Sequence, residues 1–173
     1  MKSIRAAGVI GAACASLGIT ACHARRTMAS NGETAIAATE VILHGPVSVT
    51  GTGFDQRVVL VTGAGRRRLH ASPADSAALV RAAGPTVELS VRGVEEGNDV
   101  RVRSFSVTSV GGVPVVDGIV RADGDHYWLD TPNGRVELGN PPQSLRGLVG
   151  ARVWVQGPLD RGPNAYGVLV PRP

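Results

Sequence analysis

An internal repeat constrains the fold of this 173-residue chain more than any other feature of its sequence. The stretch VLVTGAGRRRLHASPADSAALV, residues 59–80, aligns with WLDTPNGRVELGNPPQSLRGLV, residues 128–149, at an offset of 69 residues. The matched positions are Leu60 with Leu129, Thr62 with Thr131, Leu69 with Leu138, Pro73 with Pro142, and Leu79 with Leu148. Self-similarity at a fixed offset predicts two copies of one supersecondary unit.

The residue patterns around the repeat predict β-strands with two short helices. Stretches such as VRVRSFSV and ARVWVQG alternate apolar and polar residues, as strands with one buried face do, and glycine-rich turns recur between them. Two segments, Ala74–Ala83 and Gln143–Val149, follow proline and end at glycine, which is typical of helix starts and ends. Each half therefore reads as three strands, a helix and two strands.

This order of elements resembles the OB-fold, a five-stranded Greek-key barrel. The second half also resembles uncharacterised OB-like domains of secreted bacterial proteins, with a Gly-Val strand, an aromatic strand, a turn and a closing "L…L.G..V.V.G" pattern. The resemblance implies a mainly β fold with two tandem small OB-like barrels, residues 41–110 and 111–173, each with a helix between its third and fourth strands. The alternative is a single β-sandwich.

The N-terminal segment has the organisation of a bacterial export signal. Basic Lys2 and Arg5 precede a mostly apolar run from residue 6 to residue 19, which is too short for a membrane-spanning helix. Its end, Ile19-Thr20-Ala21-Cys22, resembles the lipobox of bacterial lipoproteins. The resemblance implies that residues 1–21 are removed and that Cys22 is acylated; the alternative is an ordinary secretory signal with an incidental cysteine.

A lipoprotein assignment has consequences for location and for cysteine chemistry. Two or more acyl chains on Cys22 would hold the protein permanently at a membrane, with residues 22–40 as a flexible tether. Because residue 23 is His and not Asp, the resemblance implies the outer membrane, facing the periplasm, in a Gram-negative host. Cys14 leaves with the signal, so we expect no disulfide, no cysteine metal site and no cysteine nucleophile.

No motif in the sequence predicts catalysis, a cofactor or a metal. Gly-x-Ser-x-Gly and His-Glu-x-x-His are absent, GTGFDQ lacks the third glycine of a dinucleotide site, and GAGRRR lacks the Lys-Ser/Thr of a phosphate loop. Asp123, Asp125, His126 and Asp130 lie close together, but without the spacing or closing Glu of an EF-hand, so a polar turn is the better interpretation. We expect a non-enzymatic protein without a cofactor.

Three consecutive arginines are the first candidate ligand site. Arg66, Arg67 and Arg68 lie on the predicted hairpin between the second and third strands of the first barrel. Guanidinium groups bind phosphate and carboxylate in a bidentate manner, and OB-folds commonly bind ligands on this face. The alternative is a solvated hairpin end.

Two tryptophans form the second candidate site. If their neighbours Tyr127, Leu129, Val153 and Val155 point inward, alternation turns Trp128 and Trp154 outward, in a chain otherwise poor in aromatic residues. They could contact a ligand or a partner protein. The interpretation that we favour is burial between the two barrels.

These features predict a lipid-anchored envelope protein that acts as a binding or assembly module. Its expected partners are the membrane, through the lipid anchor, and an envelope protein or an anionic ligand. The alternative function is OB-type binding of nucleic acid or another polyanion through the arginine hairpin. Removal of Lys2 and Arg5 leaves 16 of 18 basic side chains against 14 acidic ones, and this near balance, the few aromatic residues and the envelope location count against nucleic acid.

Overall fold

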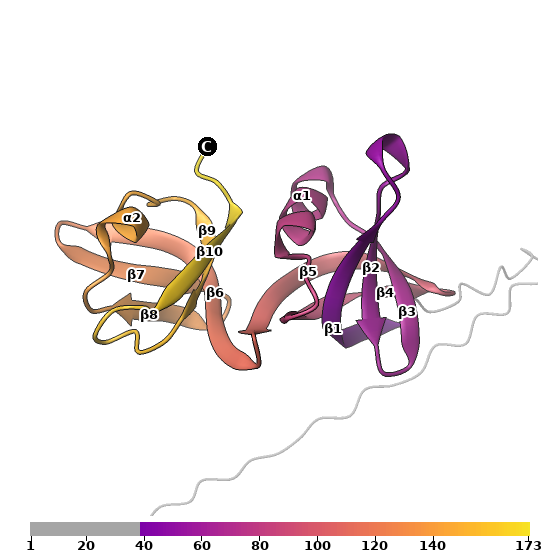
Figure 1. The fold of residues 1–173 in the computed structure, drawn as a ribbon, viewed down its shortest axis with the longest axis horizontal. Helices are drawn as coiled ribbons and strands as arrows, with labels where there is room; N and C mark the ends of the chain where they lie inside the picture. Colours follow the sequence, from indigo (N-terminus) through magenta and orange to yellow (C-terminus); the bar gives the residue numbers. More distant parts are fainter. Residues whose placement is uncertain (1–38) are drawn as a thin grey trace, which may run out of the picture. The chain divides into compact units, whose positions relative to one another are not determined.

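The computed structural model describes residues 39–173, and this part of the chain is mainly β-structure (Figure 1). The first half contains β1 (Glu40–Thr50), the 3₁₀ helix η1 (Gly53–Asp55), β2 (Arg57–Thr62), β3 (Gly65–His70), α1 (Pro73–Ala82), β4 (Val87–Glu96) and β5 (Asp99–Val110). The second half contains β6 (Val113–Asp123), β7 (His126–Thr131), β8 (Gly134–Leu138), α2 (Gln143–Arg146), β9 (Arg152–Gln156) and β10 (Ala165–Val170). The predicted mainly β class is confirmed.

The predicted signal segment, Cys22 and most of the tether lie outside the described residues. The assignment of residues 1–21 and of acylated Cys22 therefore stays a prediction. Within residues 39–173, no helix is long and apolar enough to cross a membrane.

The strands of the first half pair in a closed circuit. β1 pairs antiparallel with both β2 and β4, β2 pairs antiparallel with β3, and β4 pairs antiparallel with β5. The circuit closes through a parallel pairing of β3 with β5. Main-chain groups of each strand therefore find partners on both sides, at least over part of its length.

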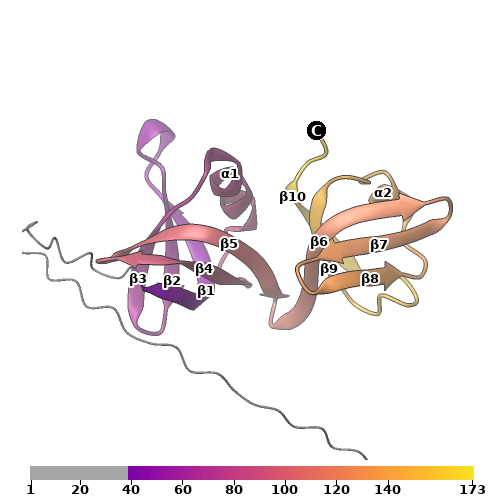
Figure 2. The ribbon, with the colours of Figure 1, turned by 180° about the vertical axis from the view of Figure 1, so that it is seen from behind.

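The second half has the same element order with one pairing fewer. β6 pairs antiparallel with β7 and β9, β7 pairs with β8, and β9 pairs with β10 (Figure 2). A pairing of β8 with β10, the counterpart of β3 with β5, is not found within the described part of the chain. The second circuit is therefore open at this position.

The hairpins β2–β3 and β7–β8 repeat at the offset seen in the sequence. Their strand pairs are in the same register, from Val58 opposite Leu69 in one and Tyr127 opposite Leu138 in the other. The turns also repeat, because Thr62 Oγ1 donates to the Gly65 carbonyl at 2.9 Å and Thr131 Oγ1 donates to the Gly134 carbonyl at 2.7 Å. The sequence repeat is thus a repeat of local structure.

Two separate clusters of buried apolar side chains hold these strands. The first core comprises Val47, Val58, Leu60, Leu69, Ala78, Leu79, Ala82, Leu89, Val91, Val100, Phe105, Val107 and Leu169. The second core comprises Val120, Leu129, Leu138, Leu145, Ala151, Val153 and Val155. The first core includes one residue from the second half, Leu169 on β10. Strand β10 contacts helix α1 of the first half.

The two predicted helices are present with different bounds. α1 begins one residue early, at Pro73, because Ser72 Oγ caps it by accepting from the Asp75 N–H at 3.2 Å. α2 ends at Arg146, three residues before the predicted Val149. The next residue is Gly147, and glycine weakens a helix interior by about 1 kcal/mol, so the chain continues in tighter turns instead.

A buried ion pair joins β5 to the second half. Main-chain pairing of β5 with β6 covers only the residues next to their turn. Beyond them, the Asp117 carboxylate on β6 accepts from the Val107 N–H at 2.9 Å and from Arg152 Nε and Nη2 at 2.8 Å each. Arg152 Nη2 also donates to the Phe105 carbonyl at 2.5 Å. The carboxylate thus supplies the acceptor that a strand partner would otherwise supply.

Candidate anion-binding face

The outer face of β2 and β3 carries three of the arginines of the first half. Val58, Leu60 and Leu69 are buried, so the alternating positions face outward. We name this surface the β2–β3 face and define it as Arg57, Val59 and Val61 of β2 with Arg66, Arg68 and His70 of β3. Opposite neighbours on it are Val59 with Arg68 and Val61 with Arg66.

The structure divides the three consecutive arginines between two faces. Arg67 lies opposite Leu60, on the inner side of the hairpin. Its guanidinium donates to Asn98 Oδ1 at 2.9 Å and lies 3.2 Å from Glu95 Oε1. Arg67 therefore ties β3 to the β4–β5 turn, whereas Arg66 and Arg68 are exposed on the β2–β3 face.

Arg57 extends the positive charge of this face and was not among the predicted site residues. It is the first residue of β2, exposed and opposite Thr50 of β1. Arg57 is two residues before Val59 and four before Val61, so strand alternation in the sequence could have placed it on the same face. Among residues 39–173, neither Arg57 nor Arg66 nor Arg68 has a carboxylate within ion-pair distance.

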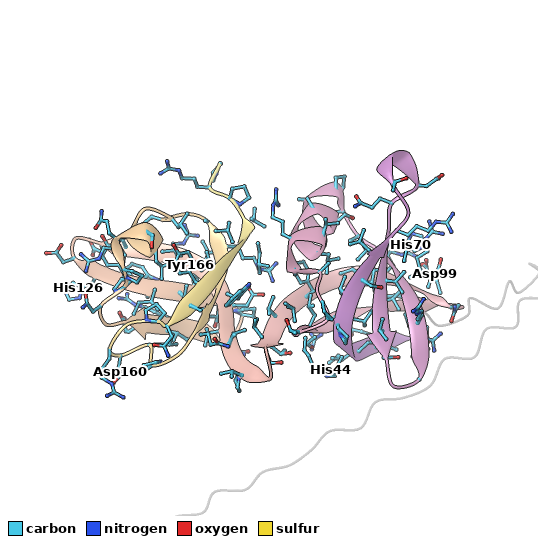
Figure 3. All side chains as sticks on the ribbon, viewed as in Figure 1. His44, His70, Asp99, His126, Asp160 and Tyr166 are labelled. Atoms are coloured by element: carbon cyan, nitrogen blue, oxygen red, sulfur yellow. The ribbon has the colours of Figure 1, made fainter. Side chains whose placement is uncertain are left out.

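His70, at the end of β3, does have an acidic neighbour. Its Nε2 lies 2.7 Å from Asp99 Oδ2, at the start of β5 (Figure 3). This bond accompanies the parallel pairing of β3 with β5. The carboxylate of Asp99 thus pairs with the imidazole of His70. The positive charge of the arginines on the β2–β3 face is not compensated by it.

A cavity of about 560 Å³ lies between the β2–β3 hairpin and α1. No acidic residue lines it, and its polar lining consists of Gln56, Arg57, Arg68, His70, Ser76 and Arg81. Arg81, from α1, donates to the Leu169 carbonyl at 3.1 Å. We name this space the arginine cavity. Sequence patterns did not point to Arg81, because it lies on a helix separate from the hairpin.

The corresponding surface of the second half is balanced in charge. This β7–β8 face comprises Trp128 and Asp130 of β7 with Arg135 and Glu137 of β8, flanked by Arg121 of β6. Arg135 Nε lies 2.5 Å from Glu137 Oε1, and Arg121 Nε lies 3.9 Å from Asp130 Oδ2. Each arginine here has an acidic neighbour, unlike those of the β2–β3 face.

Trp128 is covered by a neighbouring side chain on the β7–β8 face. The guanidinium carbon of Arg135 lies 3.8 Å from the centre of its ring, within cation–π distance. Trp128 is half-buried, while Leu129 beside it is fully buried. The outward direction expected from alternation therefore holds, and the stacked arginine covers part of the ring.

Trp154 packs against main chain and against the first core. It lies on β9 between buried Val153 and Val155, and its side chain contacts the first core. Gly167 faces it on β10, where a Cβ atom would lie 2.5 Å from the ring. The ring of Trp154 is therefore in contact with Gly167 and with the first core.

The acidic turn between β6 and β7 does not form a metal centre in the structure. No group of three or more His, Cys, Asp or Glu side chains with metal-binding proximity occurs within residues 39–173. Asp123, Asp125 and His126 are exposed around this turn, and Asp130 lies near Arg121 instead.

Comparison with known proteins gives no match, since no protein-family model, curated protein or solved structure is significantly similar to this chain.

Proposed function

We propose that this chain is a non-enzymatic, lipid-anchored protein of the cell envelope that binds an anionic ligand on the β2–β3 face. Cys22 would carry the lipid, and the two halves would be tandem OB-like barrels. The observation that carries the binding proposal is the uncompensated charge of Arg57, Arg66 and Arg68.

The OB-like interpretation is supported by strand connectivity. An OB barrel is a Greek-key barrel of five strands, and the first half pairs its five strands in a closed circuit with one helix after the third. The second half has the same order and an open circuit, and OB barrels are often partly open. Two separate cores favour tandem units over a single sandwich.

The position of the arginines within this architecture supports ligand binding. OB-folds bind oligonucleotides and oligosaccharides on the face of strands 2 and 3, which here are β2 and β3. The repeat supplies an internal comparison, because the β7–β8 face occupies the corresponding place and pairs its arginines with acids. The β7–β8 hairpin thus forms without an excess of positive charge on this face. The unpaired arginines of the β2–β3 face are therefore not needed to form the hairpin, and this favours a role in binding.

The location rests on the sequence upstream of the barrels. A lipobox ending at Cys22 follows a basic and apolar signal, and multiple acyl chains make anchoring permanent. In a Gram-negative host we place the protein in the outer membrane, facing the periplasm. The ligands available there include anionic glycans and phosphorylated lipids, which suit an arginine-rich surface.

Binding can be tested on residues 23–173, which retain every described residue. Tryptophan emission and calorimetry are recorded with single-stranded DNA, lipopolysaccharide and a cationic peptide, each at low and high salt. Anionic probes should bind in a salt-sensitive manner and the peptide should not. With the DNA probe, Arg66→Ser with Arg68→Ser should reduce the slope of log K against log salt by about 1.4, at about 0.7 per lost phosphate contact.

The matched control changes Arg121→Ser and Arg135→Ser on the β7–β8 face. These arginines already pair with acids, so the control should leave the salt dependence unchanged. Equal loss in both double variants would show that binding depends on net charge alone. That result would contradict a specific role for the β2–β3 face.

A further inference from the structure

We infer that the arginine cavity is a phosphate site, which receives a phosphate or diphosphate group of the anionic ligand. This inference rests on the proposed function and adds the chemistry of the group that is recognised. It also adds a residue outside the β2–β3 face, Arg81 of α1.

Three arginines line the cavity from three different elements. Arg57 comes from β2, Arg68 from β3 and Arg81 from α1. Arg81 is held in place by its bond to the Leu169 carbonyl, which uses one of the five N–H donors of its guanidinium group. The main chain of all three arginines is thus held in two strands and a helix, so little main-chain entropy is lost when a ligand binds.

The charge of the lining favours a multiply charged anion. Three arginines contribute to it, and no carboxylate does. Asp99 bonds to His70 but is not part of the lining. A group with two or more negative charges would offset the repulsion among three neighbouring cations.

The number of arginines in the lining favours phosphate over carboxylate. A carboxylate offers two oxygens in one plane, enough for one bidentate guanidinium. A terminal phosphate offers three oxygens around a tetrahedral centre, so several arginines can each contact it. The volume of about 560 Å³ leaves room for a second phosphate or for the residue to which the phosphate is attached.

The test compares inorganic pyrophosphate with citrate, a carboxylate anion of similar charge, by calorimetry on residues 23–173. Pyrophosphate should bind about tenfold more tightly than citrate. Arg81→Gln should weaken pyrophosphate binding about tenfold, the loss expected for one charge-assisted contact. The control Arg121→Gln, on the second half, should change it less than twofold. Circular dichroism and melting of each variant establish that it is folded.

A competition experiment identifies the source of the phosphate. Displacement of pyrophosphate by phosphatidylcholine vesicles containing phosphatidic acid, but not by vesicles without it, would assign the group to a lipid headgroup. Displacement by soluble inorganic polyphosphate alone would assign it to a polymer. Displacement by citrate at the same concentration would overturn the inference.

Failure of this inference is distinguishable from failure of the proposed function. If citrate binds as tightly as pyrophosphate and Arg81→Gln has no effect, the phosphate site is wrong. Salt-sensitive DNA binding that depends on Arg66 and Arg68 would then still support the β2–β3 face. If neither small anion nor any polyanion binds, both proposals are wrong.

Discussion

Replacement of Asp117 by alanine should destabilise the protein strongly. The Asp117 side chain is only 3% exposed and accepts three hydrogen bonds, one from the Val107 N–H and two from Arg152. The Arg152 side chain is 23% exposed, and its guanidinium carbon lies 4.4 Å from the centre of the Phe105 ring. Alanine would leave a buried main-chain N–H and a guanidinium group without their acceptor.

The expected loss of unfolding free energy is about 3 kcal/mol. Removal of one partner of a buried ion pair costs about 3–5 kcal/mol, and a buried N–H without an acceptor accounts for about 1–3 kcal/mol of such a loss. We take the lower end because Arg152 keeps its bond to the Phe105 carbonyl and can recruit water at its exposed part. The stacking of Arg152 on Phe105 would also remain.

Urea unfolding followed by circular dichroism measures this loss, with Glu137→Ala as the matched control. Glu137 also pairs with an arginine, Arg135, but the two side chains are 61% and 50% exposed, and exposed pairs contribute about 0–1 kcal/mol. A double-mutant cycle with Arg152→Met isolates the coupling between Asp117 and Arg152. If Asp117→Ala costs no more than Glu137→Ala, the reasoning from burial is refuted.

Two further predictions follow from the structure and a third follows from the sequence. In urea titrations, Arg67→Ala should lower the unfolding free energy by about 1 kcal/mol and Arg66→Ala by less than about 0.5 kcal/mol. Equal losses would contradict the placement of Arg67 and Arg66 on opposite faces of the hairpin. Gly167→Val should destabilise the chain by about 1–3 kcal/mol and shift the emission of Trp154, because the new side chain would overlap the indole ring; unchanged emission would refute that contact. Cys22→Ser should abolish palmitate labelling and move the protein from the membrane fraction to the soluble fraction, and persistence in the membrane fraction would argue against the lipobox.

The two hairpins of the repeat could be predicted from the sequence to the level of strand order. Turn residues and alternation act over a few residues, so they set hairpin register without help from the rest of the fold. Leu60 and Leu69 are buried at corresponding places, as are Leu129 and Leu138. The helix at Pro73–Ala82 was also predictable, since its cap and its proline are local signals.

The candidate site could be predicted only in part. Arg66 and Arg68 lie on the exposed face of the hairpin. The sequence predicts one site for all three arginines, whereas Arg67 points to the opposite face. Alternation from buried Leu69 contained this information. The sequence predicts one candidate site for Trp128 and Trp154, yet Trp128 lies beneath Arg135, and Trp154 packs on Gly167 and the first core.

The sequence by itself therefore determined the repeat, the order of elements and the hairpin register, because these depend on contacts between near neighbours. Only the tertiary structure decided which charged groups meet. Arg81 reaches the arginine cavity from a helix beyond the hairpin, and Asp117 meets Arg152 through the pairing of β6 with β9. Ion pairs depend on distances of a few ångströms between groups that can be far apart in the chain, and strand pairing sets those distances.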